Sequence, residues 1–174
     1  MSKLILSVLI AAMFASSALA ADFFPRFKGV APVKNAKHES ECGSCHFAYQ
    51  PGLLPSRSWR KLMEPKELED HFGDNAEMEG GERLAILDFL VKHAAETSWY
   101  KRATKINRSV PKSQTPLRIT ETRYIKRKHE EVPRKMIQDN PRVRSLSYCN
   151  NCHMRAADGV YDDDTVRIPG FPDW

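Results

Sequence analysis

The four cysteines of this 174-residue chain all lie in two copies of one short pattern. The copies are Cys42-Gly-Ser-Cys45-His46 and Cys149-Asn-Asn-Cys152-His153. C-x-x-C-H is the attachment pattern of c-type haem, in which two thiols bond to the porphyrin vinyl groups and the next histidine binds the iron. Two copies that use every cysteine therefore predict two covalently bound haem c groups.

The same pattern assigns roles to six side chains. We predict covalent haem attachment at Cys42, Cys45, Cys149 and Cys152, and proximal iron ligation by His46 and His153. Disulfides are an alternative for an exported chain, and a zinc site is another. A histidine directly after both cysteine pairs fits haem better than either.

The first twenty residues have the features of a secretory signal peptide. Lys3 supplies the positive charge, Leu4–Phe14 is an apolar run, and Ala18-Leu19-Ala20 is a small-residue cleavage site. The run is shorter than the roughly 20 residues of a membrane span, and no later stretch is apolar enough to be one. Because haem c is attached outside the bacterial cytoplasmic membrane, the chain is expected in the periplasm.

We expect one region around each haem motif. Residues 1–20 form the signal peptide, 21–100 the N-terminal haem region, 101–115 a linker or surface excursion, and 116–174 the C-terminal haem region. The linker is predicted from its high content of Lys, Arg, Ser and Pro. Modest apolar content implies that the two porphyrins complete the core, so the chain without haem should be largely unfolded.

The secondary structure is predicted to be helical, with many loops. Short helices are expected over 58–63 and 66–72, the second ending at Gly73 as C-cap. After Gly80-Gly81 an amphipathic helix should bury the face that carries Leu84, Leu87, Val91 and Ala94, which Ile86 and Leu90 broaden. A further helix is expected over 123–129, and the tail 158–174 should be irregular. No strand pattern persists, so the fold class is a mainly α, loop-rich c-type cytochrome built around two haems.

The side chain on the far side of each iron is less directly indicated. His71 lies 25 residues after His46, and His129 lies 24 residues before His153. Either spacing is long enough for the chain to return over the other face of the haem. His71 and His129 are therefore the candidate distal ligands, and thioether ligation by Met63, Met78 or Met136 remains an alternative. Two other histidines are expected to be structural: His38 in a solvated loop, and His93 on the amphipathic helix.

The charge distribution is uneven but does not indicate nucleic-acid binding. The formal charge is +5, with basic runs at 101–108 and 123–128. In a cytoplasmic protein such runs would favour nucleic acid. In an exported protein they indicate solvated helix faces, or a surface that docks an acidic redox partner.

Several longer stretches are more specific than the motif alone: residues 41–55 with Ser58-Trp59, His71-Phe72-Gly73-Asp74-Asn75-Ala76, and Cys149-Asn150-Asn151-Cys152-His153 with Ala156-Ala157-Asp158-Gly159 and Ile168-Pro169. They resemble the bacterial di-haem cytochromes c that partner the sphaeroides haem protein. The resemblance implies two histidine ligands at each iron, which favours His71 and His129. It also implies a membrane cytochrome b as electron donor and a soluble high-spin haem protein as acceptor. Tyr124-Ile125 departs from an aromatic pair of the family, which bears on packing more than on ligation.

The expected function is therefore electron transfer without catalysis. Two axial side chains on each iron would leave no open site for a substrate. The alternative is a haem enzyme, of the peroxidase or nitrogen-oxide reductase type, with one five-coordinate iron. A binding or structural module that holds zinc or disulfides is the remaining alternative.

Overall fold

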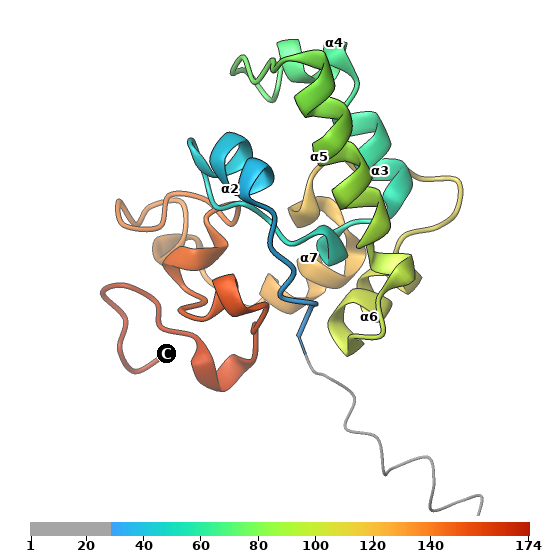
Figure 1. Cartoon of the computed structure of the whole chain (residues 1–174). Helices are drawn as coiled ribbons and strands as arrows, with labels where there is room; N and C mark the ends of the chain where they lie inside the picture. Colours follow the sequence, from blue (N-terminus) through green and yellow to red (C-terminus); the bar gives the residue numbers. More distant parts are fainter. Residues whose placement is uncertain (1–28) are drawn as a thin grey trace, which may run out of the picture.

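The computed structural model describes residues 29–174 (Figure 1). The predicted signal peptide, residues 1–20, lies outside the described residues. The α-helices are α2 (Ala36–Gly43), α3 (Ser56–Leu62), α4 (Pro65–Glu69), α5 (Gly80–Lys92), α6 (Lys101–Ser109) and α7 (Arg123–His129). Short 3₁₀ segments are η1 (Pro51–Leu53), η2 (Ala95–Thr97), η3 (Ile119–Glu121), η4 (Arg134–Met136), η5 (Cys149–Asn151), η6 (Ala156–Asp158) and η7 (Asp163–Thr165). Within residues 29–174 only isolated β-bridges occur and no strand, which confirms the mainly helical, loop-rich fold.

Helix α5 buries only part of the predicted face. The Glu79 carboxylate caps its first turn by accepting hydrogen bonds from two backbone N–H groups at 3.0 and 3.2 Å. The buried residues are Ile86, Phe89 and Leu90, whereas Leu84 is 55% exposed. Apolar residues occur on several sides of this helix, so periodicity alone could not select one. Packing against α3 does so (Figure 1).

The helix predicted over 66–72 ends before His71. His71 N–H donates to the Asp74 carbonyl at 2.7 Å, and Asp74 N–H donates back to the His71 carbonyl at 3.3 Å. Between them Phe72 and Gly73 have φ values of +62° and +105°. Positive φ at both central residues is the geometry of a type I′ turn. Gly73 is therefore a turn residue and not a C-cap.

The segment 101–109 is a helix of the core and not part of a linker. Ala103 and Ile106 on α6 are fully buried, and Val110 follows them at 6% exposure. These residues recur at helical spacing among Lys and Arg, whose long side chains leave their charges in water. Because most residues of the segment are charged or polar, its apolar face was not recognised in the sequence. The other predicted helices, over 58–63 and 123–129, correspond to α3 and α7.

One hydrophobic core joins residues from both predicted haem regions. It includes Leu54, Ile86, Ile106, Tyr124 and Tyr161. The first described residues also connect distant parts of the chain: they run between α6 and the C-terminal segment (Figure 1). Val30 N–H donates to the Gly159 carbonyl at 2.9 Å, and Arg102 N–H donates to the Gly29 carbonyl at 3.1 Å. Among residues 29–174, no helix combines the length and hydropathy needed to cross a bilayer.

The contact between Gly159 and Val30 gives a test of this packing. A Cβ on Gly159 would lie 2.2 Å from the Val30 carbonyl oxygen, and Gly159 has φ +70°. Gly159→Ala should therefore lower the free energy of unfolding of the holoprotein by about 2–4 kcal/mol, measured by denaturant unfolding. Gly80→Ala is the control, because a Cβ there meets nothing within 4 Å. Equal stabilities of the two variants would contradict the close approach.

Candidate haem sites

The first C-x-x-C-H motif lies at the end of α2 and brings His46 beside His71. Their imidazole centroids are 6.3 Å apart, and the ring planes differ by 23°. Metal–imidazole bonds are about 2 Å long, so two imidazoles on opposite sides of one ion have centroids about 6 Å apart. The I′ turn after α4 presents His71 at this distance. The pair fits one iron between its rings.

The second motif forms the corresponding arrangement in reverse chain order. His129, the last residue of α7, has its ring centroid 6.0 Å from that of His153, with the planes 79° apart. Both rings, with Cys149 and Cys152, line a cavity of about 480 Å³. That volume lies in the range of cofactor sites, about 300–1,000 Å³. Half of the other lining residues are aliphatic residues or methionine: Leu53, Ile119, Ile125, Val132, Met136, Ile137, Val143, Leu146, Val166 and Ile168.

In each pair, one imidazole forms a hydrogen bond through Nδ1, which leaves its Nε2 available to bind a metal. His46 Nδ1 lies 2.8 Å from the Phe47 carbonyl oxygen, and His129 Nδ1 lies 2.9 Å from that of Ile125. A carbonyl can only accept, so the proton is on Nδ1 and the Nε2 lone pair is free. Nδ1 of the opposing ring, His71 or His153, is buried and has no hydrogen-bond partner among residues 29–174.

Burial keeps His71 and His153 in the neutral form that binds metal. Desolvation, and next the neighbouring His129, lower the pKa of His153 to about 4. Desolvation, and next His46, also lower the pKa of His71. A neutral imidazole is the form that coordinates iron, so neither ring has to lose a proton at neutral pH.

The four cysteines are free thiols, all within the described residues. Burial raises the pKa of Cys42 and Cys149 to about 11, which keeps these thiols protonated. Zinc binds thiolate, so this environment does not favour the zinc alternative. Across residues 29–174 no group of three or more His, Cys, Asp or Glu side chains is arranged to hold a metal ion.

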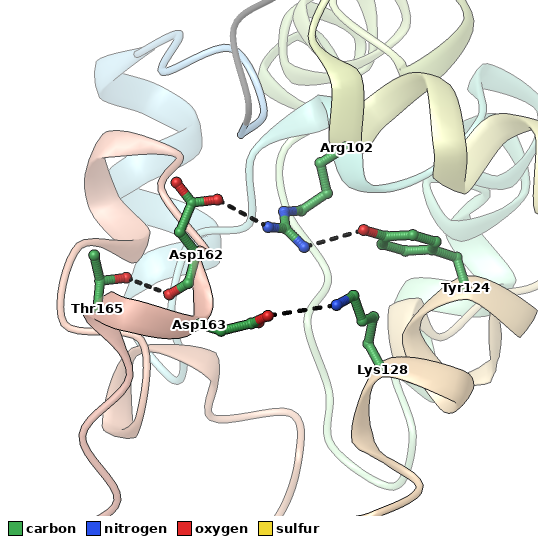
Figure 2. Close-up of polar contacts among 6 residues, drawn as sticks. All are labelled: Arg102, Tyr124, Lys128, Asp162, Asp163 and Thr165. Carbon is green, nitrogen blue, oxygen red and sulfur yellow. Dashed lines mark hydrogen bonds and ion pairs between the residues drawn. The ribbon is translucent and has the colours of Figure 1, made fainter.

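Three cationic side chains line the second cavity: Arg102, Arg127 and Lys128. Figure 2 shows the polar contacts of Arg102 and Lys128. Arg102 is 12% exposed; its guanidinium contacts the Asp162 carboxylate at 3.3 Å and the Tyr124 hydroxyl at 3.1 Å. Its Nε is buried without a partner in the described part of the chain. Lys128 is more exposed and pairs with Asp163 at 3.6 Å. Sequence reasoning missed Arg102, because the basic run 101–108 offered no sign of which cation turns inward.

Residues just after the first motif connect the two sites. The Tyr49 ring centroid is 5.0 Å from that of His46, and its hydroxyl donates to the carbonyl of Ser147, two residues before the second motif. The buried Gln50 amide donates to the Ala156 carbonyl at 2.5 Å. Gln50 Oε1 accepts from the Tyr161 hydroxyl, also at 2.5 Å. The sites are therefore joined by direct side-chain contacts.

The remaining candidate ligands lie elsewhere, with one exception. His38 is 5% exposed and packs against Phe89 at a centroid distance of 5.4 Å, so its predicted solvated loop is wrong. Its neighbours in the sequence are polar, and only the packing of α2 on α5 buries it. Met63 lies in the core, whereas Met136 lines the second cavity.

A mainly helical fold with two C-x-x-C-H motifs, each beside an opposed pair of imidazoles, defines a c-type cytochrome with two haem sites. A family model described as dihaem cytochrome c matches residues 38–161. The chain belongs to the dihaem cytochrome c family, and its cofactors are two haem c groups. It is thus a haem protein that functions in electron transfer.

Solved structures of the same kind resemble the chain over most of its length. A diheme cytochrome c from Shewanella baltica is 44% identical, with a TM-score of 0.66 over 80% of this chain and 97% of its own. A diheme cytochrome c from Rhodobacter sphaeroides is 39% identical, with a TM-score of 0.65 over 76% of this chain and 99% of its own. A comparison with curated proteins found no match.

Proposed function

We propose that this protein is a periplasmic electron carrier in which two histidines occupy both axial positions of each haem iron, so that both haems are low-spin. The observation that carries the proposal is the pairing of each motif histidine with a second imidazole, at 6.3 Å for His46 and His71 and at 6.0 Å for His129 and His153. With both axial positions taken, no substrate binds iron. The secretory signal supports the periplasmic location.

The residues of the chain hold the cofactors and exclude water from them. Haem supplies a one-electron couple when bound. Thioether links from the four cysteines would retain each haem even where an edge of the porphyrin is exposed to solvent. His46 and His129, held by their Nδ1 hydrogen bonds, cannot rotate freely, which limits reorganisation during electron transfer. Tyr49 contacts His46 with its ring and the Ser147 carbonyl with its hydroxyl, which offers a packed route between the two sites.

Spin state tests the proposal. Near-infrared magnetic circular dichroism of the oxidised holoprotein should show two low-spin haems, each with two nitrogen ligands. The reduced protein should not bind carbon monoxide. A sulfur-to-iron band would instead indicate a thioether ligand, for which Met136 is placed at the second site. A high-spin haem that binds carbon monoxide would support the haem enzyme.

The partners are proposed from the family resemblance. The donor would be a membrane cytochrome b and the acceptor a soluble high-spin haem protein. The exposed basic residues of α6 and α7, next to Trp99 at 90% exposure, offer a surface for an acidic acceptor. Stopped-flow mixing of the reduced protein with such an acceptor should give a rate that falls as salt rises. A rate independent of salt would contradict docking by these basic helices.

Arg102 is proposed to hold a propionate of the second haem. A carboxylate at its buried Nε would satisfy the one polar atom of this side chain that lacks a partner in residues 29–174. Arg102→Ala should lower the free energy of unfolding by about 2–3 kcal/mol, because a charge-assisted hydrogen bond is lost with the ion pair. It should also lower the potential of the second haem, since removal of a positive charge favours the ferric state.

Lys128→Ala is the matched control for Arg102→Ala. Lys128 is 43% exposed, so its ion pair with Asp163 should contribute less than about 1 kcal/mol. Denaturant unfolding and a redox titration would measure both variants. Equal effects on the second potential would mean that Arg102 does not contact the haem.

A further inference from the structure

The four imidazoles of the two sites are held in two different ways. His46 and His129 each donate from Nδ1 to a backbone carbonyl. The rings opposite them, His71 and His153, have no such bond within residues 29–174. A ligand without this hydrogen bond is free to turn about its bond to the metal unless packing prevents it.

Each of the two unbonded rings lies against an aromatic ring instead. The His71 centroid is 4.8 Å from that of Phe72, with the planes 55° apart. The His153 centroid is 5.2 Å from that of Tyr161, with the planes 64° apart. Contacts at these distances are energetically favourable and directional. At both sites, therefore, the ring without the Nδ1 hydrogen bond has an aromatic neighbour; at the first site His46 has one as well, Tyr49 at 5.0 Å, in addition to its hydrogen bond.

Phe72 makes its contact from a backbone conformation that phenylalanine disfavours. It is the first central residue of the I′ turn, with φ +62°, a position where Asn or Gly is preferred. A bulky side chain there is strained, and Phe72 is also 43% exposed, so burial does not explain it. The Phe72 ring does contact two neighbours: the His71 imidazole, at a centroid distance of 4.8 Å, and the Arg118 guanidinium, 3.7 Å from the ring centroid.

We propose that Phe72 is a positioning residue for the first haem: clamped by Arg118, its ring sets the plane of the His71 imidazole. It thereby keeps His71 near parallel to His46, at 23°, while the rings of the second site stand at 79°. The relative orientation of two axial imidazoles determines how the iron d orbitals split. Phe72 therefore makes the two haems electronically different. The proposal rests on His71 being an iron ligand, as the proposed function has it.

The ring-plane angles predict two distinct electron paramagnetic resonance signals in the oxidised protein. Near-parallel imidazoles give a rhombic low-spin spectrum with three resolved g values. Near-perpendicular imidazoles give a signal with a single large g value. The wild-type holoprotein should show one of each, the rhombic signal belonging to the first haem. If the first haem were high-spin, the proposed ligation and this inference would both be overturned.

Phe72→Asn tests the effect of the phenyl ring separately from that of the backbone conformation, because it removes the ring and keeps the turn. Asn is favoured at this turn position, so the variant should fold at least as well as the wild type. Without the ring, His71 can turn away from His46, and the rhombic signal should broaden and shift to larger maximum g. Cyanide should displace His71 from the oxidised first haem about two to ten times more readily than in the wild type, since one aromatic contact is lost. The signal of the second haem should not change.

Three further variants complete the test. Phe72→Trp keeps an aromatic ring and should retain the wild-type rhombic signal, and Phe72→Gly should repeat the effect of Phe72→Asn. Arg144→Asn is the matched control, because Arg144 is the other described non-glycine residue with positive φ, at +66°, and covers Tyr148 instead. It should leave the first haem unchanged. A wild-type rhombic signal in Phe72→Asn and Phe72→Gly, with His71 still bound, would overturn the inference and leave the proposed function intact.

Discussion

Replacing His71 by Ala should convert one of the two haems to the high-spin state and leave the other low-spin. His129→Ala should do the same to the other haem. Each substitution removes one of two opposed imidazoles, which stand 6.3 Å and 6.0 Å apart in the two sites. The iron then keeps four porphyrin nitrogens and one histidine, with an open sixth position. Each reduced variant should bind about one carbon monoxide per protein, measured by optical titration.

Two controls make this result specific to ligation. His93→Ala removes a histidine that packs against Phe89 and should leave both haems low-spin. Added imidazole should enter the space left in His71→Ala and restore its low-spin spectrum. Unchanged low-spin spectra in both ligand variants would show that other side chains, such as Met136 at the second site, complete the coordination.

Loss of the second attachment site should have the largest effect on stability. The double variant Cys149→Ser, Cys152→Ser can no longer retain its haem covalently, and the cavity of about 480 Å³ would have to empty or collapse. Loss of the haem would expose the apolar part of this lining to water, at a cost of roughly 25 cal/mol per Å². Because a typical domain is stable by only about 5–15 kcal/mol, this part of the core should not stay folded without its haem. We expect a protein with one haem, whose C-terminal region is unfolded by circular dichroism and proteolysis.

Asn150→Ser is the matched control for the attachment variant. It changes an exposed residue inside the second motif and keeps C-x-x-C-H intact. A pyridine haemochrome assay should find two haems in this variant and one in the double serine variant. A double variant that keeps a cooperative native unfolding transition would contradict the view that the second haem completes the core.

The sequence predicted the helices with clear boundaries better than the faces they bury. Helices α3 and α7 lie where expected, because Pro and Gly interrupt the chain around them. The faces of α5 and α6 were not predictable in the same way. Leu84 is exposed and Ile106 buried although both are strongly apolar, since burial depends on which neighbours pack there. The I′ turn at Phe72 was missed because phenylalanine is not a residue expected at positive φ.

The sequence by itself predicts two covalent haems and their proximal histidines, because the attachment motif needs only five consecutive residues. The dihaem cytochrome c family confirms the two haem c groups, and the ligand role of His46 and His153 stays a prediction. The sequence spacing made His71 and His129 candidates, and that they ligate iron stays a prediction. Only the tertiary structure placed each beside its motif histidine, oriented the rings at 23° and 79°, and turned Arg102 inward. These features depend on contacts between residues far apart in the chain, which local sequence patterns do not encode.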